Sequence, residues 1–210
     1  MILSFGELES LSFKAARGAG LDWGLAEETG KAVRWLAERG LPGPEVLMAH
    51  LPRIAGKPYA QLRPLPDADH WRPAGETLCP LINGSALSDH ATMLPDSFTL
   101  GPVLNPLLLV PFVARVAERL GRPLTLDWSD TQIACGSGGL SIEGDSMVSM
   151  ATLVTITHAG NAPQNLATGS RRSIEPAVLD VLQRLAHRTY VPATEASRLA
   201  GAGAGTSDND

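Results

Sequence analysis

The sequence contains little of the material that several classes of protein require. Only two of its 210 residues are cysteines, Cys79 and Cys135, which is too few for a disulfide framework or a cysteine-based zinc site. Lysine and arginine total 17 against 22 aspartates and glutamates, and the basic residues are scattered along the chain. Because phosphate binding needs a clustered basic face, we do not expect a nucleic acid as partner.

Long apolar runs and export signals are also missing. The most apolar stretch, Pro106 to Ala117, is shorter than the roughly 20 residues that a membrane-spanning helix needs. Glu7 and Glu9 occupy the region in which a signal peptide carries basic residues. We therefore expect a cytoplasmic protein that has no membrane partner.

The familiar catalytic signatures are absent as well. The sequence contains neither the GxSxG pattern of a nucleophile elbow nor the HExxH or HxxxH spacing of a metal site. Residues 136–139 read Gly-Ser-Gly-Gly, but no helical pattern follows them, so they do not indicate a phosphate or dinucleotide loop. Neither a metal nor a cofactor is expected.

The composition is that of a folded protein, with 44% hydrophobic and 19% charged residues. A chain of this length buries roughly 70% of the surface of its unfolded state, so it needs no disulfide to be stable. Prolines recur between Pro52 and Gly75, but Tyr59 and Trp71 lie among them and favour a packed connection over a free linker. We predict a single domain over residues 1–198 and a Gly/Ala-rich tail over residues 199–210.

The first part of the chain has a helical period. Ser4 and Glu7 have the spacing of a capping box and predict a helix over residues 5–17. Asp22 is placed to cap a second helix that ends near Gly40. A third helix is expected from Pro44 to Leu51, with Pro52 closing it.

Beyond residue 77 the period changes to two residues. Residues 78–82 and 85–91 flank Asn83-Gly84 and predict a β-hairpin. Asn105-Pro106 indicates the start of a helix that ends at Gly121 and that either begins or is kinked at Pro111.

Strands are then predicted over residues 124–128, 131–135, 140–144 and 148–158, and a last helix follows Ser173 as its N-cap. This order indicates an α+β fold: N-terminal helices, a mostly antiparallel β-meander with one inserted helix, and a C-terminal helix.

The first candidate site is a substrate-binding site for an anion at Arg171, Arg172 and Ser173. Two guanidinium groups and a hydroxyl precede a predicted helix, whose first amides carry partial positive charge and can hold a carboxylate or phosphate. The alternative is a solvated loop with an ordinary serine cap.

The second candidate is the catalytic pair Asp89 and His90. Histidine suits proton transfer near neutral pH, but neighbouring residues on a strand point to opposite faces, so Asp89 is not expected to orient His90. The alternative is an exposed histidine at the end of a strand.

Weaker candidates lie at the ends of the predicted meander. Paired carboxylates there would support acid/base chemistry or bind a hard cation, although turn aspartates commonly make local hydrogen bonds only. Cys135 would need a neighbouring base to act as a nucleophile, so a buried apolar role is favoured for it and for Cys79. The carboxylates are Asp127, Asp130, Glu143 and Asp145, with His158 at the end of the longest predicted strand.

The C-terminal segment alternates glycine and alanine over residues 199–205. Its amides can approach a ligand or a partner closely, or the segment can extend into solvent. Together with Gly20–Glu28 and Arg34-Trp35-Leu36, the stretch from Thr189 to Gly205 resembles the ends of a bacterial protein family of similar length that has no assigned function. The resemblance implies a bacterial, non-secreted protein and supplies no catalytic residues.

These features lead to two hypotheses about function. The first is a cytoplasmic enzyme of small-molecule metabolism that binds a small anionic ligand at Arg171, Arg172 and Ser173 and transfers protons with His90 or a carboxylate. The second is a non-catalytic accessory or regulatory subunit whose C-terminal tail docks on a partner. A homo-oligomer and a hetero-oligomer both remain open.

Overall fold

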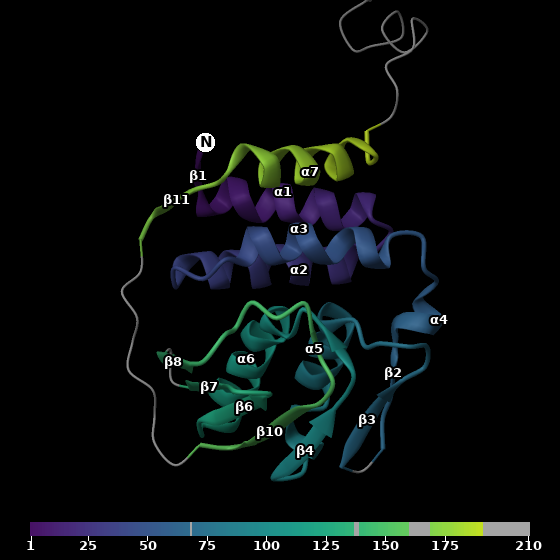
Figure 1. Cartoon of the computed structure of the whole chain (residues 1–210), viewed down its shortest axis with the longest axis vertical. Coiled ribbons are helices and arrows are strands. Elements are labelled where there is room, and N and C mark those ends of the chain that lie inside the picture. The colour runs from purple at the N-terminus through teal and green to yellow at the C-terminus, as the bar shows by residue number, and fades with distance from the viewer. Residues whose placement is uncertain (68, 137–138, 160–168, 191–210) are drawn as a thin grey trace, which may run out of the picture.

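The computed structural model describes residues 1–67, 69–136, 139–159 and 169–190. Helices stack on one another at one end of the molecule, and the large sheet lies at the other end (Figure 1). The helices are α1 (Phe5–Gly18), α2 (Trp23–Glu38), α3 (Gly43–Ile54), α4 (Tyr59–Leu62), α5 (Pro80–Asp89), α6 (Val110–Leu120) and α7 (Pro176–His187), with 3₁₀ turns at Ala91–Met93 and Pro106–Leu109.

The strands form one large sheet and two small ones. The large sheet has the order β2-β3-β4-β10-β6-β7-β8, and β1 pairs with β11 and β5 with β9. The strands are β1 (Ile2–Ser4), β2 (Pro64–Leu65), β3 (His70–Pro73), β4 (Ser97–Leu100), β5 (Val103–Leu104), β6 (Leu124–Trp128), β7 (Thr131–Gly136), β8 (Gly139–Glu143), β9 (Met150–Ala151), β10 (Val154–His158) and β11 (Arg171–Ser173). The α+β class predicted from the sequence is confirmed.

The first two helices follow their sequence signals closely. Ser4 and Glu7 form the capping box: the Glu7 amide donates to Ser4 Oγ at 3.3 Å, and the Ser4 amide donates to Glu7 Oε2 at 2.8 Å. Asp22 is the N-cap residue of α2, although its side chain makes no capping hydrogen bond. Gly40 follows α2 with φ +74°, a left-handed conformation that glycine adopts without strain.

Two proline predictions had different outcomes. Pro111 lies in the first turn of α6, so the helix begins there, which was one of the two alternatives. The prediction that Pro52 ends α3 is wrong, because the helix continues to Ile54 with Pro52 inside it. Proline removes one backbone hydrogen bond near the end of the helix, and burial of Leu51 and Ile54 offsets that loss.

The predicted hairpin around Asn83-Gly84 is also wrong, because this segment is helix α5. Pro80 lies in its first turn, and Asn83 Nδ2 donates to the Cys79 carbonyl at 2.7 Å. Gly84 packs against the ring of Phe112 on α6. The helix is buried on most sides, so its apolar residues do not recur with the period of an amphipathic helix and instead imitate a strand.

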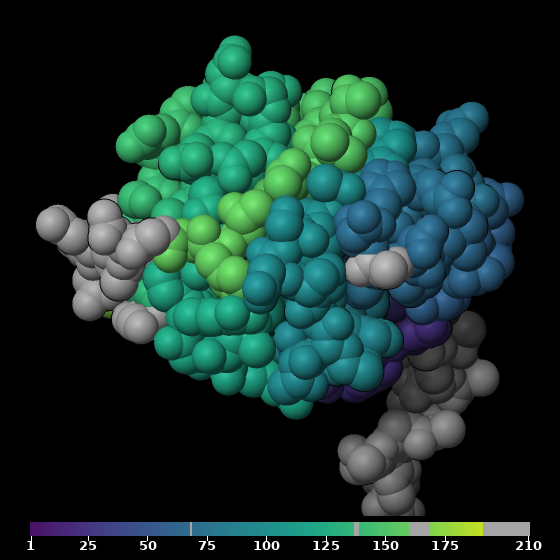
Figure 2. Space-filling view, turned by 90° about the horizontal axis from the view of Figure 1, so that it is seen from below, coloured from purple at the N-terminus to yellow at the C-terminus, as the bar shows by residue number. Residues whose placement is uncertain are grey.

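The antiparallel meander is confirmed. β6 pairs with β7 and β7 with β8, with Ile133 opposite both Leu126 and Ile142. β10 lies between β4 and β6 and is antiparallel to both, whereas β3 runs parallel to β4. The predicted strand over residues 148–158 is divided into β9 and β10. Seen from the side opposite the helical stack, the sheet strands form the surface, and the N-terminal helix appears only at one edge (Figure 2).

The two ends of the described chain meet at the helical stack. β1 and β11 pair antiparallel, with Leu3 opposite Arg172, and the amide of Ile174 donates to the Met1 carbonyl at 2.7 Å. Ser173 therefore belongs to a strand, and the predicted N-cap role at this position is wrong: Glu175 precedes the first residue of α7. This pairing brings α7 alongside α1.

One contiguous apolar core joins the helical stack to the sheet. Leu8 of α1, Leu36 of α2, Phe112 of α6 and Ile156 of β10 all belong to it and are almost fully buried. Among the described residues, no helix combines the length and the apolar composition that crossing a bilayer requires.

Replacing Gly84 by alanine tests the close contact between α5 and α6. A Cβ at this position would lie 2.3 Å from the Phe112 ring, so we expect the free energy of unfolding to fall by about 1–3 kcal/mol. Gly24→Ala is the matched control, since Gly24 also lies in a helix but has no atom near its Cβ position. The control should raise stability by up to ~1 kcal/mol. Urea denaturation of both variants would measure the difference, and equal effects would contradict the packing described.

Candidate functional site

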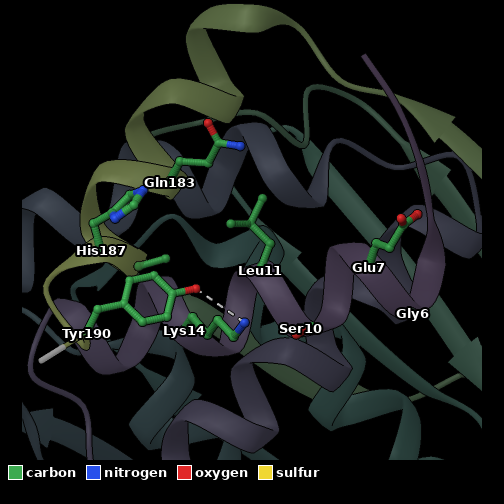
Figure 3. Close-up of a pocket in the computed structure, with 9 residues that line it drawn as sticks. Gly6, Glu7, Ser10, Leu11, Lys14, Gln183, His187 and Tyr190 are labelled. Atoms are coloured by element: carbon green, nitrogen blue, oxygen red, sulfur yellow. Dashed lines mark hydrogen bonds between the residues drawn. The ribbon is translucent and has the colours of Figure 1, made fainter. Parts of the chain in front are cut away.

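A groove between α1 and α7 hollows the described surface. The cavity has a volume of about 540 Å³ and is open to solvent. Figure 3 shows Glu7 at one end, Lys14 and Tyr190 at the other, and Leu11 between them. The lining residues are Gly6, Glu7, Ser10, Leu11, Lys14, Gln183, Ala186, His187 and Tyr190.

The amphipathic character of the two helices accounts for this groove. Leu8 and Ala15 of α1 and Leu182 and Leu185 of α7 point into the core and fix the two helices side by side. Residues on the opposite sides of these helices, among them Ser10 and Gln183, are left to line the space between them. The groove therefore follows from burial of the apolar faces.

A second cavity of about 390 Å³ adjoins the first, because Lys14 and Tyr190 line both. We call it the basic pocket. Its lining contains three cationic and three aromatic side chains and no carboxylate: Phe13, Lys14, Arg17, Trp23, Arg188, Thr189 and Tyr190.

The rings and cations of the basic pocket are in mutual contact. Phe13 and Trp23 meet edge to face with their centroids 5.1 Å apart, and the Arg17 guanidinium lies 5.7 Å from the centroid of Trp23. Lys14 Nζ donates to the Tyr190 hydroxyl at 3.4 Å. Arg17 Nη1 also donates to the Leu21 carbonyl at 2.6 Å, which fixes its side chain at the end of α1.

Arg188 is the least constrained cation of the basic pocket. It is exposed, and no hydrogen bond or ion pair holds its side chain among the residues that the structure describes. Together with Lys14 and Arg17 it puts three cations beside the aromatic faces. Such a combination attracts an anion electrostatically and stacks against a planar ring. The nearest acidic side chain in the described contacts is Glu27, which lines a neighbouring cavity and accepts a hydrogen bond from Trp23 Nε1 at 2.9 Å.

The acidic end of the groove has one carboxylate. Glu7 Oε2 accepts hydrogen bonds from the Ser4 hydroxyl at 2.7 Å and the Ser4 amide at 2.8 Å. The pKa of Glu7 is lowered, first by the bond from the Ser4 side chain, then by the bond from its backbone, and in smaller part by the charge of Arg171. Glu7 is therefore anionic at neutral pH, and its Oε1 faces no described donor.

The residues predicted to bind an anion lie on β11, outside both cavities. Arg172 is held by α3: its Nη2 lies 3.2 Å from each carboxylate oxygen of Glu45, and its Nη1 donates to the Leu41 carbonyl. Arg171 and Ser173 are exposed, and Arg171 stands opposite Ser4 in the strand pairing. Arg172 thus ties β11 to α3, while an anion-binding role for Arg171 and Ser173 stays a prediction.

The predicted catalytic pair lies at the end of α5, in the sheet half of the molecule and remote from β11 (Figure 1). His90 Nδ1 donates to the Ala86 carbonyl at 2.9 Å, and its ring meets Trp71 edge to face. Asp89 is exposed and makes no contact with His90 that would orient the imidazole. The structure does not bring this pair together with Arg171, and a catalytic role for it stays a prediction.

The weaker candidates make local contacts. Asp127 accepts from Gln132 Nε2 at 2.7 Å, Asp145 accepts from the Met147 amide at 2.8 Å, and His158 Nε2 lies 2.8 Å from Asp96 Oδ1. Within the described part of the chain, no three histidine, cysteine or acidic side chains gather as they would around a metal ion. Ser137 and the tail over residues 199–210 lie outside the described residues.

A fully buried polar cluster connects α3 to the start of α5. His50 Nδ1 lies 3.2 Å from Asn105 Oδ1, and His50 Nε2 lies 3.3 Å from Cys79 Sγ. Since the amide oxygen only accepts, Nδ1 carries the proton and Nε2 accepts from the Cys79 thiol. Cysteine, histidine and asparagine are the residue types of a thiol-protease triad.

Burial keeps His50 and Cys79 neutral, so the Cys79 thiol is not an activated nucleophile. Desolvation lowers the pKa of His50 to about 4 and raises the pKa of Cys79 to about 11, so the thiolate–imidazolium pair does not form at neutral pH. Cys135 is buried too, and desolvation raises its pKa to about 12. Both cysteines are buried, as expected, but Cys79 belongs to a polar cluster and is not packed only against apolar groups.

Little in the sequence indicates the groove. Trp23 and Tyr190 are 62% and 53% exposed, whereas an aromatic residue within a helical pattern is usually expected in the core. Lys14 and Arg188 are 174 residues apart, and only the docking of α7 on α1 makes them neighbours. The sequence shows only that each of the two amphipathic helices has a polar face. That pattern does not indicate a hollow between the helices.

Comparison with known proteins finds a family model that is similar to one part of the chain. The model of a family described as "Protein of unknown function (DUF3726)" matches residues 3–79. The expectation of an uncharacterised family is confirmed over this range, which contains α1 to α3 and all residues of the basic pocket except those from α7 and its end. No curated protein matches the sequence.

Two solved structures are similar to this chain. A dehydrogenase from Sinorhizobium meliloti superposes with a TM-score of 0.56 and 11% identity, covering 89% of this chain and 99% of that one. At this identity the likeness concerns the fold only. A malate dehydrogenase from Entamoeba histolytica gives a TM-score of 0.44 and 14% identity, covering 68% of this chain, which spans 45% of the length of that enzyme.

The buried His50 predicts how stability depends on pH. Its folded-state pKa of about 4 lies below the unfolded value of 6.5, so the unfolded state binds the extra proton between these values. The free energy of unfolding should therefore fall by about 3 kcal/mol as the pH is lowered from 6.5 to 4. Urea denaturation of the wild type and of His50→Gln would measure this, and the variant should show a shallower decline. Parallel curves would contradict a neutral, buried His50.

The two cysteines should be unreactive in the folded protein. Both are fully buried and have raised pKa values, so a thiol reagent has neither access nor a thiolate to attack. We expect titration with Ellman's reagent to detect no thiol under native conditions and both thiols in concentrated guanidinium chloride. Rapid labelling of Cys79 in the native protein would show that the His50 cluster is accessible.

Proposed function

We propose that this protein binds a small anionic molecule that carries a planar ring, and that the basic pocket is the binding site. The observation that supports this most directly is the lining of the pocket, in which three cations stand beside three aromatic rings without a carboxylate. A ring can stack on Trp23 and Tyr190 while its carboxylate or phosphate meets Lys14 and Arg188. The proposal agrees with the sequence in expecting an anionic ligand, but it assigns this ligand to a site at the end of α1 and not to β11.

The dimensions of the pocket favour a compact ligand. A volume of about 390 Å³ is within the range of small-molecule sites, and solvent reaches the pocket from one side. Because Arg17 is already held by the Leu21 carbonyl and Arg188 is unrestrained, Arg17 would supply a fixed charge and Arg188 one that adjusts to the ligand.

The first hypothesis from the sequence was an enzyme, and this proposal changes which side chains are its candidate catalytic groups. His187 meets the Tyr190 ring edge to face with centroids 5.3 Å apart, and Lys14 donates to the Tyr190 hydroxyl. Histidine, tyrosine and lysine are all able to transfer protons. Lys14 and Tyr190 line both cavities and His187 lines the groove beside them, so we propose these three as the groups for acid/base chemistry on an anion bound to Arg188.

Binding of naphthoate tests the proposal. We expect naphthoate to bind, whereas naphthylmethanol, which lacks the charge, and acetate, which lacks the ring, should bind much more weakly in calorimetric titrations. Arg188→Gln should weaken naphthoate binding about three- to tenfold, since it removes one partly exposed charge-assisted contact. Lys14→Gln should have a similar effect.

Arg184→Gln is the matched control. Arg184 lies one helical turn before Arg188 and pairs with Asp180 at 3.3 Å, and it lines neither cavity. This variant removes the same charge from the same helix and should leave the affinity for naphthoate unchanged. Equal loss in both arginine variants would indicate a general charge effect, and absence of naphthoate binding to the wild type would refute the proposal.

A further inference from the structure

The two cavities beside α1 form one continuous surface with opposite charges at its ends. Lys14 and Tyr190 line both cavities and mark the point where they join. Glu7 is the sole carboxylate among the residues that line them, and it stands at the far end of the groove from Lys14 and Tyr190 (Figure 3), which the groove shares with the basic pocket. A ligand that follows the whole surface therefore meets a negative charge at one end and positive charges at the other.

From this arrangement we propose that the groove binds the C-terminal end of a short extended peptide. The free carboxylate and the ring of a C-terminal aromatic residue occupy the basic pocket, and the preceding residues run along α1 until the amino terminus reaches Glu7. The inference rests on the proposed function, because it identifies the planar anion of that proposal as a peptide terminus.

The separation of the charges suits such a peptide. Glu7 and Lys14 are seven residues apart on α1, which corresponds to about 10 Å at a rise of ~1.5 Å per residue. Arg17 lies about 15 Å from Glu7 by the same measure. An extended chain advances about 3.3 Å per residue, so about three to five residues span the distance from Glu7 to the cations.

The walls of the groove suit a peptide backbone better than a set of large side chains. Leu11 and Ala186 provide an apolar floor, and Ser10 from α1 and Gln183 from α7 provide hydroxyl and amide groups on opposite sides. Such groups donate to and accept from peptide N–H and C=O groups alike. Of the two cavities that form this surface, only the basic pocket is lined by Phe13 and Trp23, so these rings contact the side chain of the last residue only.

The acidic end is built to hold a positive charge without losing its helix cap. Glu7 uses Oε2 for both bonds from Ser4 and leaves Oε1 for an ammonium group. Arg171 is close enough to lower the pKa of Glu7 and reduces the net charge at this end. We therefore expect the amino terminus to contribute less to affinity than the carboxylate.

The test uses the full-length protein and the tetrapeptide Ala-Ala-Ala-Phe in calorimetric titrations. Amidation of the peptide carboxylate should weaken binding to the wild type about tenfold, and acetylation of its amino terminus about threefold. In Glu7→Gln, acetylation should no longer matter, because glutamine preserves the capping box but carries no charge. In Arg188→Gln, the effect of amidation should shrink. Glu118→Gln, which removes an exposed carboxylate that lines neither cavity, should behave like the wild type.

The outcomes separate this inference from the proposal on which it rests. If naphthoate binds and the tetrapeptide neither binds nor displaces it, the peptide inference is overturned and the anion site stands. Peptide binding that responds equally to acetylation in the wild type and in Glu7→Gln also overturns the inference. Concentration-dependent self-association that Arg188→Gln abolishes, without peptide binding, would assign the groove to a second copy of the chain and overturn the inference too. If neither probe binds, both proposals fail.

Discussion

The pairing of β1 with β11 is the contact on which the candidate site depends. These two short strands are separated by more than 160 residues of sequence, yet Ile2 lies opposite Ser173, and Met1 and Ile174 exchange two hydrogen bonds next to this pair. Pairing of this kind closes a long loop, which costs conformational entropy. Burial of Leu182 and Leu185 of α7 beside Leu8 and Ala15 of α1 offsets that cost. Without this contact, neither the groove nor the basic pocket would exist.

The elements that the sequence predicted well are those that local chemistry determines. The capping box at Ser4 and Glu7, the glycine that ends α2 and the alternation in β6 and β7 all act within a few residues, and the structure agrees with them closely. The wrong predictions concern segments whose structure depends on contacts with residues that are distant in the sequence. Residues 80–89 form a helix because Gly84 fits against Phe112, which lies 28 positions away, and Ser173 is in a strand because β1 pairs with it. A pattern that is buried on all sides carries no periodic signal.

The candidate site was missed for the same reason. A groove between two helices is a property of their packing, and the sequence indicates only which face of each helix is polar. Arg171 and Arg172 attracted attention because they are adjacent to each other and precede a helix, but Arg172 uses its charge to hold Glu45. Lys14 and Arg188 carried no local signal, and they became candidates only because α7 lies against α1. Adjacency in sequence is thus a poor guide to which cations share a ligand in this fold.

Closure of the fold by β1 and β11 also affects when binding becomes possible during synthesis. Protein chains emerge from the ribosome with the N-terminal residues first. Helices α1 to α3 can form early, but α1 keeps its groove-lining face open to solvent until α7 has been synthesised and has docked. The residues between Lys14 and Arg188, 174 positions apart, are therefore synthesised before the two cations can share the pocket. Ligand binding in the basic pocket would accordingly report that α7 has docked on α1.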